Sequence, residues 1–190
     1  MSTSPPKPFE TLEYVIDPAD RIARVSPTWD VFAWANSAPH LVAQTVVGTL
    51  IWDYISGPMV HNLYQDFFTQ ARRTLRPIEF PFRCDAPERR RFLEMHILAQ
   101  PDGTLVLTTR TVQEEPRPAV ALLTLPESRG DDVLELCSFC KLVHLPDDTW
   151  APAEEAVVQL DLFGEAIAPA GVTHSVCPAC LPELHRRLGL

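Results

Sequence analysis

Apolar and polar positions at the start of the chain follow a pattern typical of short β-strands. Two apolar runs, residues 12–16 and 22–25, are separated by Asp17-Pro18-Ala19-Asp20, whose residue types favour a tight turn. The pattern predicts a β-hairpin.

The next fifty residues carry helical signals. Ser26-Pro27 combines a helix cap with proline at the first helical position, and it predicts a helix of about nine residues that ends near Asn36. The segment 50–55 is short and densely apolar, which predicts that it packs inside. Gly57-Pro58 begins a longer helix, because apolar residues then recur at three- and four-residue spacing until residues 75–77 end it.

Three strand candidates follow this helix: residues 78–83, 91–98 and 104–111, with Pro101-Asp102-Gly103 as the turn between the last two. Apolar groups occupy both faces of the middle strand, which indicates that segments cover both faces of the sheet. The whole pattern predicts an α+β fold with an antiparallel sheet and short helices.

This element order, with the words IDPADRIARVSPTWDVFAWAN, VVGTLIWDYISGPMVHNLYQDFF and RPIEFPFRCDAPERRRFLEM, resembles the small bacterial PAS-like sensor domains over residues 10–112. The resemblance implies a cavity between sheet and helices that holds a small molecule, or a surface that forms dimers or binds another protein. Neither a haem nor a flavin site is expected.

Several side chains are candidates for such a ligand or partner site. Trp29, Trp52 and Tyr54 are candidates for the cavity wall, although aromatic residues of this kind also fill ordinary cores. Arg83 and Asp85 follow a strand closely, and they either clamp the structure as an ion pair or present a polar site.

The strongest chemical signal is a pair of CxxC motifs, Cys137-Ser-Phe-Cys140 and Cys177-Pro-Ala-Cys180. Each motif places two thiolates on one side of a turn, and two such turns that face each other complete a tetrahedral site for zinc. His174 lies three residues before the second motif. It is a candidate for packing beside a thiolate or, less favoured, for direct ligation.

The four cysteines have three other interpretations. A rubredoxin-like iron site uses the same four sulfurs, a single CxxC pair can act as a redox or oxidant-sensing centre, and buried thiols can be incidental. A nucleic-acid-binding zinc ribbon is disfavoured, because the residues around the motifs are acidic.

The words LCSFCKLVHLPDDTWAPAEEAV and THSVCPACLPEL resemble the C-terminal cysteine module of bacterial PAS, response-regulator and histidine-kinase-related proteins, over residues 133–185. Asp148 stands where that module has glycine. The resemblance implies a signalling context. The expected division is a disordered N-terminus (1–9), a PAS-like sensor domain (10–112), a proline-containing linker (113–132) and a zinc module (133–190).

Composition and charge limit the function further. The net charge of −9 argues against gripping nucleic acid, although residues 72–91 carry seven arginines against three acidic residues. That stretch is either a solvated face or a docking patch. No nucleophile elbow or phosphate-binding glycine loop is present, so we expect no enzyme activity. We expect a cytoplasmic protein without a membrane segment, with a signalling protein as partner and homodimerisation left open.

Overall fold

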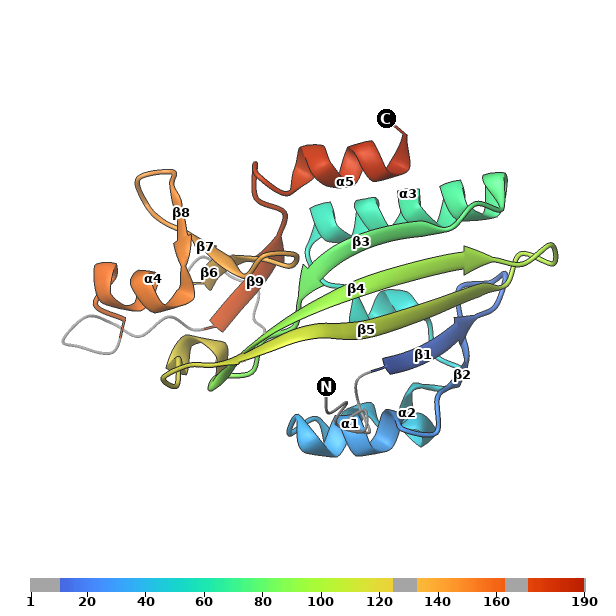
Figure 1. The fold of residues 1–190 in the computed structure, drawn as a ribbon, viewed down its shortest axis with the longest axis horizontal. Coiled ribbons are helices and arrows are strands. Elements are labelled where there is room, and N and C mark those ends of the chain that lie inside the picture. The colour runs from blue at the N-terminus through green and yellow to red at the C-terminus, as the bar shows by residue number, and fades with distance from the viewer. Residues whose placement is uncertain (1–10, 125–132, 163–170, 190) are drawn as a thin grey trace, which may run out of the picture.

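The computed structural model describes residues 11–124, 133–162 and 171–189. The predicted disordered segment 1–9 lies outside these ranges. Within them the chain forms one five-stranded sheet, one four-stranded sheet and the helices that pack on them (Figure 1). No helix in the described ranges is both long enough and apolar enough to cross a lipid bilayer.

The five-stranded sheet is antiparallel throughout, with strand order β2-β1-β5-β4-β3. The turn between its first two strands forms as predicted, because the Asp17 carboxylate accepts hydrogen bonds from the main-chain N–H groups of Ala19 and Arg21, both at 2.9 Å. The strands are β1 (Thr11–Ile16), β2 (Ile22–Val25), β3 (Ile78–Arg83), β4 (Arg89–Ala99) and β5 (Leu105–Pro116). The predicted α+β class with an antiparallel sheet is confirmed.

Helices fill the chain between β2 and β3. The long helix α3 buries the apolar face that its sequence spacing predicts, with Val60, Leu63, Phe67, Phe68 and Ala71 inside. The shorter elements are mostly single turns, and only Ile51 of the predicted interior segment 50–55 is buried. These elements are α1 (Trp29–Ala35), η1 (Pro39–Leu41), α2 (Ala43–Val46), η2 (Ile51–Tyr54) and α3 (Pro58–Thr74).

The C-terminal third forms a second, smaller sheet with strand order β8-β7-β6-β9, in which β6 and β9 are parallel. In the turn between β7 and β8, Asp148 adopts φ +63°, the left-handed region that favours glycine. Aspartate tolerates this region better than most residues do. The elements are β6 (Val133–Cys137), β7 (Leu142–His144), β8 (Trp150–Pro152), α4 (Ala153–Gln159), β9 (Gly171–Ser175) and α5 (Leu181–Leu188).

The C-terminal third contributes side chains to the hydrophobic core of the larger sheet. Phe139, Val176 and Leu184 from the C-terminal third are buried in the same cluster as Phe67 and Phe80. The helix α5 lies alongside α3 (Figure 1), where the Gln70 side chain donates a hydrogen bond to the carbonyl of Leu188 at 3.1 Å. The C-terminal third is therefore docked on the larger sheet rather than tethered to it.

Residues 113–124, the described part of the segment predicted as a linker (113–132), contribute to the folded structure. Its first residues, 113–116, complete β5. Val120 and Leu122 are buried against Leu136 and Val143 in a second core that belongs to the C-terminal third. A run of apolar residues cannot remain in water when a neighbouring face is apolar, so this segment packs.

Candidate metal centre

The first CxxC motif forms the turn that follows β6. The main-chain N–H of Lys141 donates to the carbonyl of Cys137 at 3.0 Å, and Lys141 adopts φ +61°, which folds the chain back on itself. The Phe139 side chain is 4% exposed and points into the shared core. The apolar side chain inside the motif therefore anchors the turn to this core.

The second motif forms the turn between β9 and α5. The N–H groups of Cys180 and Leu181 both donate to the carbonyl of Cys177, at 3.0 and 3.1 Å, so the turn continues directly into the helix. Parallel pairing of β6 with β9 places Cys137 opposite Ser175, and the N–H of Ser138 donates to the carbonyl of Ser175 at 2.9 Å. The two turns therefore meet at the same end of adjacent strands.

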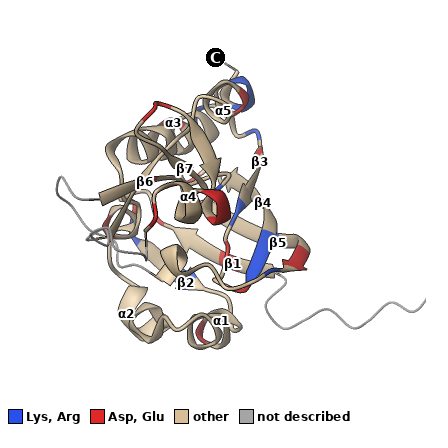
Figure 2. Ribbon diagram, turned by 90° about the vertical axis from the view of Figure 1, so that its left-hand side faces the viewer, with Lys and Arg blue, Asp and Glu red and all other residues tan. Residues whose placement is uncertain are grey.

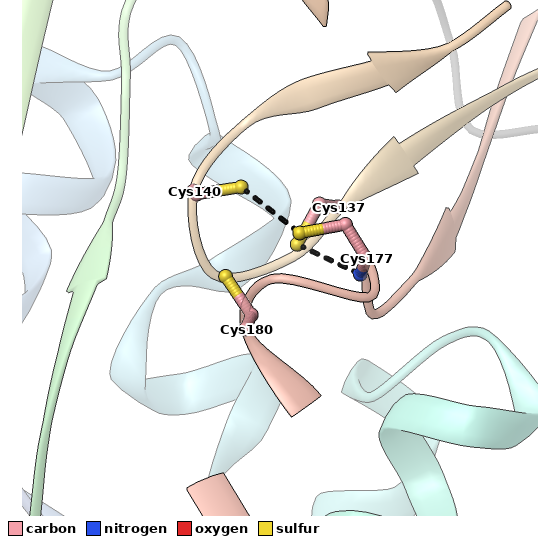
Figure 3. A group of neighbouring side chains, drawn as sticks. All are labelled: Cys137, Cys140, Cys177 and Cys180. Carbon is pink, nitrogen blue, oxygen red and sulfur yellow. Dashed lines mark hydrogen bonds between the residues drawn. The ribbon is translucent and has the colours of Figure 1, made fainter. Parts of the chain in front are cut away.

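The four cysteine sulfurs all lie within 4.8 Å of one another. The sulfurs of Cys140 and Cys177 are 3.5 Å apart, and the N–H of Cys177 points at the sulfur of Cys137 at 3.4 Å (Figure 3). Sulfurs at the corners of a tetrahedron around zinc are separated by about 3.8 Å, given Zn–S distances of about 2.3 Å. The four cysteines are positioned to hold a metal ion.

The electrostatics of the thiols also favour a cation. Hydrogen bonds from Cys140 and then from Cys180 lower the pKa of Cys137, so this sulfur is the preferred thiolate. The pKa of Cys140 is raised to about 12, mainly because its proton is held in the hydrogen bond to Cys137. The pKa of Cys180 is raised by hydrogen bonds to Cys137 and Cys140. Neighbouring thiolates repel one another. A divalent cation at the centre would neutralise the repulsion between them and let all four thiols ionise.

The centre is buried on one side only. Cys137 and Cys177 are buried, whereas Cys140 and Cys180 are half-buried. Cys140 and Cys180 lie in the wall of a groove of about 520 Å³, which Phe82 and Phe92 also line. The donor set of four sulfurs fits zinc and iron equally well.

His174 is placed by the β-sheet beside the centre. It lies opposite Leu136 in the pairing of β6 with β9, and it does not belong to the group of four ligand residues. Its main-chain carbonyl lies against Gly57 at the start of α3. Direct ligation by His174 is therefore not part of the observed cluster.

Arg83 and Asp85 contact each other and hold the first cysteine turn. The Arg83 guanidinium donates to both Asp85 carboxylate oxygens and, at 2.9 Å, to the carbonyl of Cys140. The main-chain N–H of Arg83 donates to the carbonyl of Phe139 at 2.8 Å. The geometry is that of a clamp between β3 and the cysteine turn, and a role in binding a ligand or partner stays a prediction.

The Asp85 carboxylate has a second cationic partner, which sequence reasoning missed. Arg117 approaches Asp85 at 3.1 Å and Glu154 at 2.9 Å, and the side chains of Asp85 and Arg117 are 0% and 4% exposed. Arg90 reaches the same Glu154 oxygen at 2.8 Å, where the acidic start of α4 faces the basic segment of β4 (Figure 2). Because Arg117 lies in the segment predicted as a linker, the sequence does not indicate a buried partner for it.

The arginine-rich stretch 72–91 is largely used inside the molecule. Besides Arg83 and Arg90, Arg72 donates to the carbonyls of Gly103 and Asp17, and Arg91 donates to the carbonyl of Cys84 and the Asn36 side chain. Each of these four side chains links two segments, whereas Arg73, Arg76 and Arg89 are exposed, as a solvated face requires, and a docking role stays a prediction.

An apolar cavity of about 300 Å³ lies between the five-stranded sheet and the helices. Trp29 and Tyr54 line it, and their role in binding a ligand stays a prediction. Trp52 lies outside the wall, where its ring packs on His61 and Phe68 and its N–H donates to Asp20 at 3.0 Å. No histidine or charged side chain occurs among the described residues of the wall. The wall comprises Leu12, Tyr14, Ile22, Trp29, Phe32, Leu41, Val46, Ile51, Tyr54, Ile55, Tyr64, Phe82, Cys84, Leu93, Met95 and Thr109.

Tyr14 and Tyr64 are two phenols of the cavity wall that the sequence pattern does not single out. Burial raises the pKa of both phenols, so both remain neutral hydrogen-bonding groups. Tyr14 lies in a predicted strand, and Tyr64 lies among the apolar positions of the predicted long helix. These positions are the signal that could have identified them.

Comparison with known proteins adds no relative: no protein-family model matches this chain, and no curated protein matches its sequence. Functional inference therefore depends on the residues themselves.

Proposed function

We propose that this chain is a cytoplasmic signalling protein in which a PAS-like sensor unit and a structural zinc module form one folded body. The observation that carries the proposal is the convergence of the four cysteine sulfurs, within 4.8 Å of one another, where the C-terminal third docks on the larger sheet. The site lies where the two parts of the molecule pack together, and structural zinc sites typically have four protein ligands and no open position.

The sensor half of the proposal is supported by the cavity and by the element order. Two strands, short helices, one long helix and three antiparallel strands follow one another as the PAS resemblance requires. The cavity of about 300 Å³ is at the lower end of the size range of small-molecule sites, and its wall is apolar with a few hydroxyl groups. An uncharged small molecule with one hydrogen-bonding group suits this wall.

One observation favours a second candidate, a redox centre that holds iron in the four-cysteine site. Cys140 and Cys180 border a groove, so an oxidant could reach two of the four sulfurs. A purely structural site has no need of this access.

Native mass spectrometry and metal analysis of untagged protein purified in air test both candidates. The proposal expects one zinc per chain, a colourless protein and a co-purifying small molecule that denaturation releases. A red protein with one iron per chain would support the redox candidate instead. Protein that folds and contains no metal would overturn both.

A further inference from the structure

The cavity and the cysteine cluster share parts of their walls. Tyr64 lines the cavity, and its ring stacks on Phe139 with a centroid distance of 6.5 Å and an interplanar angle of 21°. Phe139 lies inside the first CxxC motif, between Cys137 and Cys140. One aromatic contact therefore connects the cavity to the turn that supplies two of the four sulfurs.

The strand β3 and the residue after it make a second connection. Phe82 and Cys84 line the cavity, while Arg83 between them binds the carbonyls of Phe139 and Cys140 at 2.8 and 2.9 Å. Three consecutive residues thus contact the cavity and the cysteine turn together. A shift of β3 at the cavity must move the carbonyls of that turn, because the hydrogen bonds allow little slack.

From these contacts we infer that occupancy of the cavity and metal binding at the four cysteines are thermodynamically coupled, each favouring the other. The inference rests on the proposed function, because it requires both a metal and a cavity ligand. A molecule that fills the cavity holds Tyr64 and Phe82 in place. In these positions Tyr64 stacks on Phe139, and Arg83, next to Phe82, keeps its hydrogen bonds to the cysteine turn. The metal, by fixing the cysteine turn, holds the same wall from the other side. Coupling of this kind is reciprocal.

The coupling gives the zinc module a role beyond support. When the cavity empties, the wall formed by Tyr64 and Phe82 loses its packing on one side. The cysteine turn then loses part of its support, and the docked C-terminal third becomes the element that reports the state of the cavity. The signal would pass through packed contacts over the shared core, without a separate hinge.

The test measures zinc transfer from the zinc-loaded full-length protein to a chromophoric chelator, with and without N-phenyl-1-naphthylamine. This probe is uncharged, apolar and fluorescent in apolar surroundings, and it carries one N–H. At equilibrium we expect saturating probe to raise the apparent zinc affinity about fivefold or more, so that less zinc transfers to the chelator, and fivefold is the usual lower limit of allosteric coupling. The measurement starts from the folded, loaded protein, so it does not depend on whether the metal-free chain folds.

Two variants show whether the effect travels through the proposed contact. Phe139→Leu keeps all four cysteines and an apolar side chain but removes the ring that stacks on Tyr64, and we expect the probe to lose most of its effect on zinc transfer. Trp52→Leu removes a ring that packs on the same core outside the cavity wall, with a centroid distance of 4.6 Å to His61, and it should keep the effect.

The failures are distinguishable. If probe fluorescence shows binding and zinc transfer is unchanged, the coupling is overturned while the proposed function stands. If the probe does not bind, the sensor half of the proposed function is overturned together with the coupling. Equal loss of the effect in both variants would overturn the assignment to the Tyr64–Phe139 contact.

Discussion

A β-carbon on Gly57 would lie 1.9 Å from the carbonyl oxygen of His174. Gly57 precedes α3 and His174 belongs to β9, so the main chains of the two parts of the molecule touch at this point. Gly57 also has φ +84°, which L side chains rarely adopt. Glycine here permits the close docking that brings the cysteine cluster onto the larger sheet.

Replacement of Gly57 tests this contact. Gly57→Ala combines backbone strain with a clash against main-chain atoms, and we expect it to lower the free energy of unfolding by about 3 kcal/mol. Urea denaturation measures the loss. Gly48→Ala is the matched control, since Gly48 has φ +90° and no atom within 4 Å of the β-carbon that alanine would add, and we expect a loss of about 1 kcal/mol. Equal losses would show that the close approach to His174 is unimportant.

Loss of one sulfur should release the metal. Cys180→Ser is expected to reduce the metal content well below one ion per chain and to speed amide hydrogen exchange in β6 and β9, because metal binding contributes to the folding free energy. Metal analysis and hydrogen exchange provide the readouts. Cys84→Ser removes a cysteine that lies outside the cluster and should leave the metal content unchanged. Unaltered metal content in Cys180→Ser would contradict the assigned ligand set.

The buried carboxylate of Asp85 should be essential to stability. Asp85→Ala leaves Arg83 and Arg117 without their shared partner, and we expect a loss of about 3–5 kcal/mol in the free energy of unfolding. By comparison, Glu13→Gln breaks the exposed pair with Arg24 and should cost less than about 1 kcal/mol. Chemical denaturation of both variants checks the ranking, and a smaller loss for Asp85→Ala than for Glu13→Gln would refute the clamp.

Glu154 should make the protein sensitive to acid. Partial burial raises the pKa of Glu154, but hydrogen bonds from its backbone N–H, Arg90 and Arg117 outweigh this and lower the pKa to about 2. A carboxyl whose folded-state pKa lies below its ordinary value of 4.5 stabilises the fold above that value. The stabilisation is lost as pH falls from about 4.5 towards 2.

Substitution at Glu154 tests that acid sensitivity. In Glu154→Gln we expect a loss of about 1–2 kcal/mol at neutral pH, after allowance for solvent screening, and a smaller further loss between pH 4.5 and pH 2. Urea denaturation across this pH range gives the measurement. Glu155→Gln changes the exposed neighbour and should keep the acid dependence of the unaltered chain. Identical pH profiles for Glu154→Gln and the unaltered chain would contradict the assignment.

Local patterns in the sequence determined much of this protein. Turn residues defined the first hairpin, three- and four-residue spacing identified the buried face of α3, and the two CxxC motifs identified all four cysteines of the cluster. The hairpin, the helix face and each single CxxC turn depend on residues that are close in the chain, so short-range geometry is enough to predict them. The meeting of the two CxxC turns depends on the pairing of β6 with β9.

Only the tertiary structure decided which surfaces meet. Periodicity predicts that a face is apolar, but it does not say which other face covers it. For that reason the sequence did not reveal that Phe139 packs on Tyr64 or that Trp52 turns away from the cavity. The partners of Arg83 and Arg117 are likewise distant in the chain, and charge pairing has no sequence period. The metal cluster could thus be read from spacing, whereas its contact with the cavity depends on the docking of two sheets.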